Sequence, residues 1–157
     1  MNKERELQVR DIMTQDPACC TPETTLRDVA RLMMEHDCGA IPVVDGKETM
    51  TLIGVITDRD IICRTVALGK NPLEVTAREC MSSPSVMVSP ETSLDECCKT
   101  MEASLVRRIP VVDSSGSCCG IVSQADIAKN AAIEDTAEVV KQISQPTKSA
   151  SNSPRLV

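Results

Sequence analysis

Two pairs of polar side chains, Thr57 with Asp60 and Ser123 with Asp126, have the types and the spacing to bind a small polar ligand. Each pair follows a short apolar run and precedes a helical pattern, so we expect it where a strand passes into a helix. A carboxylate only accepts hydrogen bonds, and it can take both hydroxyls of a cis-diol. The amides at a helix start, together with the positive end of the helix dipole, suit an anion. Both pairs are therefore candidate binding residues.

The same residues also make an ordinary helix cap. Thr57 would accept a hydrogen bond from a backbone amide, and Asp60 would lie favourably in the first helical turn. Because nearly every helix needs such a cap, one pair alone favours this structural interpretation. The presence of the second pair within a longer repeat favours the binding role, and the two roles are compatible.

An internal repeat determines the predicted architecture. Met13 aligns with Met81, and at the same offset each copy contains a Pro-Glu-Thr segment and an Ile-Pro-Val-Val-Asp segment. The matched segments are 21–26 with 89–94 and 41–45 with 109–113. After these segments the spacing between matched residues of the two copies becomes two residues shorter, and at this spacing the two candidate pairs align. We expect this deletion in the turn between strands, where a change of length costs little.

Each copy predicts the element order strand, helix, strand, strand, helix. In the first copy a short strand at 18–21 precedes a helix that Thr24 or Thr25 can cap, and Gly39 fits the helix exit. The strands 41–45 and 52–56 follow, and a second helix runs from Asp58 to about Leu68, where Gly69 can end it. In the second copy the helical pattern persists to about Ile143.

Apolar residues at helical spacing predict the buried face of the first helix in each copy. In the first copy these residues are Leu26, Val29, Ala30 and Met33. In the second copy they are Leu94, Cys97, Cys98, Met101 and Leu105. Residues 146–157 have too little apolar content to pack, and this composition predicts a disordered tail.

Composition and charge restrict the partners. The 157 residues carry a net charge of −6, with no basic run and no Phe, Tyr or Trp. No aromatic platform for stacked bases can form, which argues against nucleic acid as a partner. The apolar runs are far shorter than the roughly 20 residues that cross a bilayer, and the N-terminus lacks the apolar centre of a signal peptide. We expect a soluble, cytoplasmic protein that has no membrane partner.

Nine cysteines, in a chain without an export signal, are expected to be reduced thiols. Eight of them align with an apolar residue in the other copy, which indicates cysteine used as a small hydrophobe. Cys63 aligns with Lys129 and is predicted to be the exposed thiol. His36 is predicted at the surface with no ligand set around it, so we expect no metal site. A thiol-redox or metal-dependent enzyme is the alternative, although no nucleophile with a base emerges.

Both copies contain a Pro-Val-Val-Asp strand and a Gly-x-x-[Thr/Ser]-x-x-Asp corner, and together they resemble a tandem pair of cystathionine-β-synthase (CBS) domains. The likeness covers about residues 7–130 and is similar to a small stand-alone bacterial Bateman module. It implies an α/β (α+β) fold in which two β-α-β-β-α repeats, 7–69 and 76–143, pack through their sheets as a pseudo-two-fold pair. It also implies clefts that bind AMP, ADP, ATP, NAD or S-adenosylmethionine as a regulatory ligand, without catalysis.

The resemblance implies a role for each residue of the two sites. In the family pattern the corner Asp holds both ribose hydroxyls, the Thr or Ser contacts phosphate, and the backbone before Ile-Pro lines the adenine slot. The first implied site contains Cys38, Gly39, Ala40, Ile41, Pro42, Thr57, Arg59 and Asp60, with Cys20 beside adenine. The second contains Val106, Arg107, Arg108, Ile109, Pro110, Ser123 and Asp126, with Val88 beside adenine.

The two implied sites differ in charge. Gly39 and Ala40 in the first copy become Arg107 and Arg108 in the second, whereas Arg59 becomes Ala125. These arginines could add charge-assisted contacts to phosphate. Alternatively, Arg107 and Arg108 are solvated surface charges, and one of the two sites is vestigial.

The second helix of each copy has more apolar residues than one packed face needs. They are Ile61, Ile62, Val66 and Leu68 in the first copy and Ile127, Ala128, Ala131, Ala132 and Ile133 in the second. An exposed apolar patch usually marks an interface, and CBS pairs commonly associate through such helices. We therefore expect a homodimer that reports ligand occupancy to an effector protein. A structural dimer whose clefts have decayed is the alternative.

Overall fold

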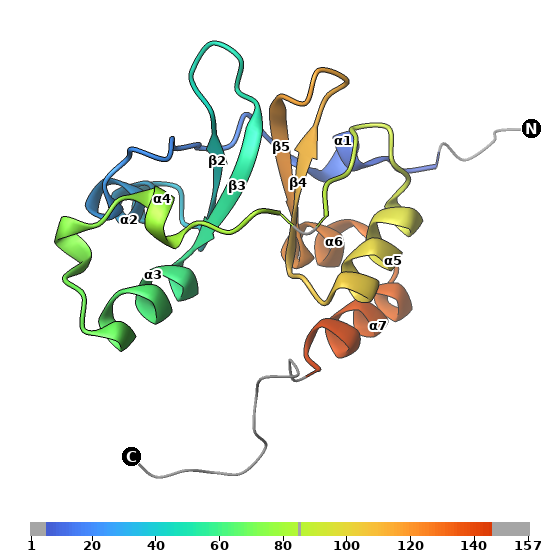
Figure 1. Cartoon of the computed structure of the whole chain (residues 1–157). Helices are drawn as coiled ribbons and strands as arrows, with labels where there is room; N and C mark the ends of the chain where they lie inside the picture. The colour runs from blue at the N-terminus through green and yellow to red at the C-terminus, as the bar shows by residue number, and fades with distance from the viewer. Residues whose placement is uncertain (1–5, 85, 146–157) are drawn as a thin grey trace, which may run out of the picture.

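The computed structural model describes residues 6–84 and 86–145. Its two repeats lie side by side, with one β-hairpin from each in the middle of the molecule and helices on the outer sides (Figure 1). This arrangement confirms the predicted mixed α/β fold of two paired repeats.

The first part of the chain contains α1 (Val9–Ile12), β1 (Thr14–Gln15), α2 (Leu26–Glu35), β2 (Ala40–Val44), β3 (Leu52–Thr57) and α3 (Asp58–Arg64). Two 3-10 turns, η1 (Val66–Leu68) and η2 (Pro72–Glu74), lead to α4 (Ala77–Cys80). The second part contains α5 (Leu94–Ser104), β4 (Arg108–Val112), β5 (Cys118–Ser123), α6 (Gln124–Asn130) and α7 (Ile133–Ile143). The short strand predicted before α2 is a single parallel bridge between Cys20 and Val43.

The two hairpins have the same register. Ala40 pairs with Thr57 in the first, Arg108 pairs with Ser123 in the second, and each ladder shifts within its Val-Val pair. The hairpins also contact each other near their turns, where the amide of Cys118 donates to the carbonyl of Met50 at 2.9 Å. The predicted two-residue deletion falls in these turns, where it leaves the paired strands unchanged.

Each repeat receives its leading segment from the other side of the molecule. β1 pairs antiparallel with β5, and Val9 and Ile12 of α1 are buried in the core of the second repeat. Ala77 and Cys80 of α4 are buried in the core of the first. After α1 the chain therefore crosses from the second repeat to the first (Figure 1). The repeat ranges 7–69 and 76–143 stay a prediction. The packing shows in addition that the two repeats exchange their leading segments.

The helix faces agree with the predicted apolar pattern at most positions. Leu26, Val29 and Met33 of α2 are buried, as are Cys97, Cys98 and Met101 of α5. Of the other predicted face residues, Leu94 is partly buried and two are exposed. Ala30 is exposed, and Leu105 follows α5 in the left-handed region with φ 53° and is 42% exposed.

Two predicted helix ends were wrong, and one predicted helical stretch is divided. α2 ends at Glu35, and the left-handed residue after it is Asp37 (φ 48°) rather than Gly39. α3 ends at Arg64, after which η1 continues to the left-handed Gly69. The last helical pattern ends at Ile143 as predicted, but it is broken at residues 131–132, so α6 and α7 are separate helices. In each case, the apolar periodicity continues across a break in the backbone that periodicity alone cannot locate.

α7 completes the core of the second repeat. Its side chains Val139 and Ile143 are buried, and they belong to the same cluster as Met101 of α5 and Ile127 of α6. This packing explains why the helical pattern persists to Ile143. The tail predicted to be disordered, 146–157, lies outside the described residues.

The cysteines agree with the prediction from the alignment of the copies. Cys20, Cys80, Cys97, Cys98 and Cys118 are buried, and Cys63 is exposed. Burial raises the pKa of the Cys20 thiol to about 11 and that of the Cys97 thiol to about 12. No helix within the described ranges is long and apolar enough to span a membrane.

Candidate functional site

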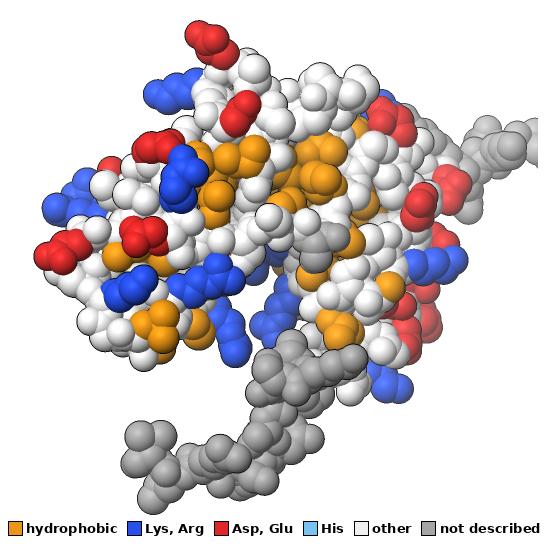
Figure 2. Space-filling model, in the orientation of Figure 1, with side chains coloured by type: hydrophobic (Ala, Val, Ile, Leu, Met, Phe, Trp, Pro, Cys, Tyr) orange, Lys and Arg blue, Asp and Glu red, His pale blue; other side chains and the backbone are white. Residues whose placement is uncertain are grey.

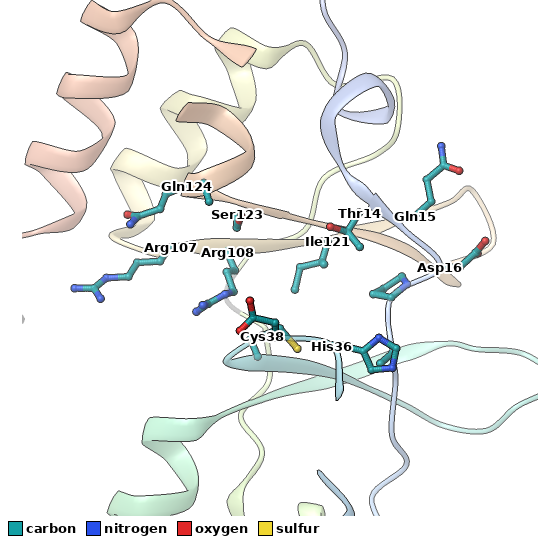
Figure 3. A pocket seen from close by; sticks show the side chains of 15 residues that line it. Thr14, Gln15, Asp16, His36, Cys38, Arg107, Arg108, Ile121, Ser123 and Gln124 are labelled. Atoms are coloured by element: carbon teal, nitrogen blue, oxygen red, sulfur yellow. The ribbon is translucent and has the colours of Figure 1, made fainter. Parts of the chain in front are cut away.

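A cavity of about 470 Å³ lies between the repeats (Figure 3). Three stretches form its walls: the segment that contains β1, the segment between α2 and β2, and the hairpin and corner of the second repeat. The lining residues are Thr14, Gln15, Asp16, Pro17, Ala18, His36, Asp37, Cys38, Ala40, Arg107, Arg108, Ile121, Ser123, Gln124 and Ala125. The cavity therefore exists only because the two repeats pack together.

The corner of the second repeat is a reciprocal helix cap. The amide of Asp126 donates to Ser123 Oγ at 3.2 Å, while the amide and the hydroxyl of Ser123 donate to Asp126 Oδ2 at 2.8 and 2.9 Å. Thr57 and Asp60 form the same box in the first repeat, with bonds of 3.0 and 3.1 Å. The cap interpretation of both pairs is confirmed, and it occupies Oδ2 of each carboxylate.

Each corner is also tied to the segment before the Ile-Pro strand. The amide of Asp58 donates to the carbonyl of Gly39 at 3.1 Å, and the amide of Gln124 donates to the carbonyl of Arg107 at 3.0 Å. Several of the helix-start amides that we predicted to bind an anion therefore donate to acceptors within the chain. Among the described residues that line the cavity, Arg107 and Arg108 carry cationic side chains.

Arg107 and Arg108 extend from the start of β4 in different directions. Arg108 reaches toward Cys38 of the first repeat, whereas Arg107 points away from it along the other side of the strand (Figure 3). A Cβ on Gly39 would lie 3.4 Å from Arg108 Nη2 and 2.9 Å from Asp58 Oδ2. A side chain at residue 39 would therefore crowd the carboxylate of Asp58 and would also touch Arg108, which crosses toward the first repeat.

The cavity combines residues from both predicted sites. Cys38 and Ala40 come from the first set, and Arg107, Arg108 and Ser123 come from the second. Asp126 is held behind Ser123 by the cap. The apolar members of the two sets are buried: Cys20, Ile41, Pro42, Val88, Ile109 and Pro110. Five other members do not line this cavity. Arg59 is exposed, and the other four are partly buried: Gly39, Thr57, Asp60 and Val106.

Sequence reasoning missed the wall formed by residues 14–18 and the side chains of His36 and Asp37. The first wall was missed because the leading segment belongs to the first copy in sequence but pairs with β5 of the second. The alignment of Met13 with Met81 indicated a repeated leading segment, but it could not indicate the exchange. His36 is exposed as predicted, and it also lines the cavity.

The cavity contains both signs of charge. Asp16 lies on the wall that contains β1, Asp37 lies on the wall between α2 and β2, and Arg107 and Arg108 lie at the start of β4. On the face shown in Figure 2, Lys and Arg side chains border the hollow between the two halves. A ligand with an anionic group and a neutral, partly apolar body suits such a site.

A family model described as CBS domain matches the chain twice, at residues 9–65 and 77–133. Hypoxic response protein 1 of Mycobacterium tuberculosis is 37% identical over 142 residues, which are 90% of this chain and 97% of that protein. A crystal structure of Hypoxic Response Protein I with two coordinated zinc ions gives a TM-score of 0.70 at 36% identity, covering 80% of this chain and 100% of that one.

Two solved structures contain adenosine compounds. CBSX2 from Arabidopsis thaliana, in complex with AMP, gives a TM-score of 0.66 at 27% identity and covers 79% of this chain and 95% of that one. The CBS domain pair of protein MJ0100, with 5′-methylthioadenosine and S-adenosyl-L-methionine, gives 0.69 at 25% identity, covering 79% and 94%. Within the described part of this chain, no group of three or more His, Cys, Asp or Glu side chains is placed to hold a metal ion.

Proposed function

Because this chain belongs to the CBS domain family, we propose that it is a regulatory module that binds an adenosine-containing ligand between its two repeats. The observation that carries the proposal is the cavity of about 470 Å³, which both repeats build and which two arginines border. Its size lies within the range of roughly 300–1,000 Å³ that is usual for small-molecule sites. The AMP and S-adenosyl-L-methionine complexes of CBS-pair proteins support adenosine as the shared part of the ligand.

Among adenosine compounds, we favour those with a phosphate: AMP, ADP, ATP or NAD. Arg108 and Arg107 supply guanidinium groups, which form charge-assisted hydrogen bonds with phosphate oxygens. Ser123 Oγ lies at the same end of the cavity. S-Adenosylmethionine carries a positive sulfonium, so these arginines disfavour it.

The ribose is assigned to the corner carboxylate. Asp126 uses Oδ2 in the cap, and a carboxylate has a second oxygen that can accept from a ribose hydroxyl. Cys38, Ala40 and Ile121 supply an apolar wall for adenine. This assignment makes Asp126 the more important of the two corner carboxylates, because the described cavity lies at its corner and not at that of Asp60.

We propose no catalytic role. Ser123 and Asp126 are engaged with each other in the reciprocal cap, in which the Ser123 hydroxyl donates to Asp126 Oδ2 and Ser123 Oγ accepts from the amide of Asp126. Ser123 is held as a helix cap. Ligand occupancy would act on the packing of the repeats, since both line the cavity, and an effector protein would detect that change.

Calorimetric titration with AMP, ADP, ATP, NAD and S-adenosylmethionine tests the proposal, after mass spectrometry of any small molecule released from the purified protein. We expect Asp126→Asn to weaken AMP binding by about 10- to 100-fold, since hydrogen bonds to charged groups contribute about 1.5–3 kcal/mol. Asp60→Asn is the matched variant at the other corner, and its effect should be smaller. Unchanged affinity in both single variants and in the double variant would refute the ribose assignment.

A homodimer is proposed for the same module. Ile62, Val66 and Leu68, on α3 and η1, are 59%, 61% and 65% exposed, and together they form an apolar surface. Light scattering coupled to size-exclusion chromatography, with refractive-index detection, should give a dimer mass. Ile62→Glu with Val66→Glu should give a monomer. A wild-type monomer mass that persists at high concentration, with and without AMP, would contradict the dimer.

A further inference from the structure

Cys19 and Cys118 form a thiol pair between the two repeats that the proposed function does not use. Cys19 lies in the segment that leads from β1 to the first repeat, and Cys118 is the first residue of β5. The backbone of the two segments is held together by the β1–β5 ladder, which the amide of Asp16 extends by donating to the carbonyl of Cys119 at 3.2 Å. That bond places Pro17 beside the start of β5.

The side chains of Cys19 and Cys118 also approach each other. Cys19 Sγ lies 3.3 Å from the carbonyl oxygen of Pro17, the residue beside the start of β5. The thiols of Cys19 and Cys118 share a hydrogen bond, and Cys118 Sγ also contacts the carbonyl of Gly120 at 3.6 Å. Cys19 is half-buried and Cys118 is 6% exposed, so a small oxidant can enter from the Cys19 side.

The shared hydrogen bond makes the two thiols unequal. It lowers the pKa of the Cys118 thiol, whereas the same bond, followed by burial, raises the pKa of the Cys19 thiol. Elsewhere in the cores burial raises the pKa of the Cys20 and Cys97 thiols. A thiolate is the reactive form of cysteine, so Cys118 is the nucleophile of the pair and Cys19 its resolving partner.

We propose that Cys19 and Cys118 are a redox site, which a peroxide converts into a disulfide that links the two repeats beside the cavity. The Cys118 thiolate attacks one peroxide oxygen, the O–O bond breaks, and a sulfenic acid forms while hydroxide leaves as water. The Cys19 sulfur then loses its proton and attacks the Cys118 sulfur, the S–O bond breaks, and a second water leaves. Two thiols and one hydrogen peroxide thus give one disulfide and two waters.

The Cys19–Cys118 disulfide would restrict the motion of one wall of the cavity. Residues 14–18 precede Cys19 directly, and Ile121 and Ser123 follow Cys118 on the same strand. Oxidation therefore fixes the β1 segment against β5, and a thiol reductant frees it. The reaction needs no bound nucleotide, so it stands or falls separately from the ligand proposal.

Peptide mapping of the full chain tests the site. The protein is treated with hydrogen peroxide, its remaining thiols are blocked with iodoacetamide, and it is digested with trypsin. We expect a linked pair of peptides, 11–27 with 109–129, that dithiothreitol separates. Each peptide has two neighbouring cysteines, so Cys20→Ala and Cys119→Ala serve as matched controls that should retain the link. Cys19→Ala and Cys118→Ala should each abolish it.

Two results would overturn the inference. One is a link between these peptides that survives Cys19→Ala, a variant at a half-exposed position that leaves both cores unchanged. The other is oxidation that stops at the exposed Cys63 while the two peptides stay unlinked. Hydrogen exchange gives a second readout: amides of residues 14–18 should exchange more slowly in the oxidised protein, and unchanged exchange would refute the clamping of that wall.

Discussion

The two repeats have nearly the same backbone but carry different side chains at their facing ends. Both hairpins have the same register and the same shift, and both corners form the same reciprocal cap. At the start of β2 the chain has Gly39 and Ala40, whereas at the start of β4 it has Arg107 and Arg108. Gly39 leaves the space into which Arg108 extends. The charge of the cavity thus depends on positions at which the two copies have different residues.

The repeats also differ in how their outer helices are covered. In the second repeat α7 inserts Val139 and Ile143 into the core beside α5 and α6. In the first, η1 and η2 follow α3, and Val66, Leu68 and Leu73 are 61%, 65% and 69% exposed. The second repeat is completed by its own chain, and the first presents the apolar surface that we assign to a partner subunit.

Removal of α7 should have the largest effect on stability. Truncation after Ala131 removes two buried side chains, Val139 and Ile143, each contributing about 1.5–3 kcal/mol, and it exposes the residues beneath them. We expect a loss of several kcal/mol in urea denaturation followed by circular dichroism. Truncation after Gln145 is the control and should leave the midpoint unchanged. Equal midpoints for the two truncations would show that α7 does not support the second core.

The exchanged segments predict a specific coupling between residues. A Cβ on Gly120 would lie 2.5 Å from Met13 Sδ, so Gly120→Ala should destabilise the fold by about 1–3 kcal/mol through overpacking. Met13→Ala should relieve part of that cost, whereas Met81→Ala should not, because Met81 packs on Gly54 of the other repeat. A double-mutant cycle measures the coupling. Equal coupling of Gly120 to Met13 and to Met81 would contradict the exchange.

Features that are repeated and that depend on nearby residues could be predicted from the sequence. The corner residues, the hairpins and the buried face of α2 follow from periodicity and from cap chemistry, which act over a few residues. The alignment of the copies also identified Cys63 as the exposed thiol. The walls of the cavity could not be predicted in this way. Residues 14–18 lie on the second repeat only through long-range pairing with β5, and Arg108 meets Gly39 across the interface between repeats.

Buried thiols should make the second core sensitive to alkaline pH. Burial raises the pKa of the Cys97 and Cys98 thiols from 9.0 to about 12 and about 11. Their contribution to stability is thus complete below about pH 9, where unfolded thiols are still protonated, and it is lost as the pH rises through the folded values. Cys97→Val with Cys98→Ala copies Val29 and Ala30 of the first repeat. Urea midpoints should fall less between pH 8 and 10 in this variant, and an identical fall would refute the assignment.

The hairpin turns should show the smallest effect. Hydrogen bonds from Thr49 lower the pKa of Asp45, and hydrogen bonds from Ser115 lower the pKa of Asp113. Their stabilisation is present above about pH 4 and is lost as the pH falls through the lowered values. Asp45→Asn and Asp113→Asn should each flatten the fall of the melting temperature below pH 4. If neither variant changes that slope, the turn carboxylates do not contribute to the acid sensitivity.

The central claim is that the unrepeated arginines of the second repeat bind the phosphate of an adenosine ligand. It is tested most directly by calorimetric titration of AMP and of adenosine into wild-type protein and into the Arg107→Gly, Arg108→Ala variant, which copies the first repeat. We expect the variant to lose about 10- to 100-fold in AMP affinity while its adenosine affinity is unchanged. Arg31→Ala, at an exposed cation paired with Asp28 on α2, is the matched control. An unchanged ratio of AMP to adenosine affinity in the variant would contradict the claim.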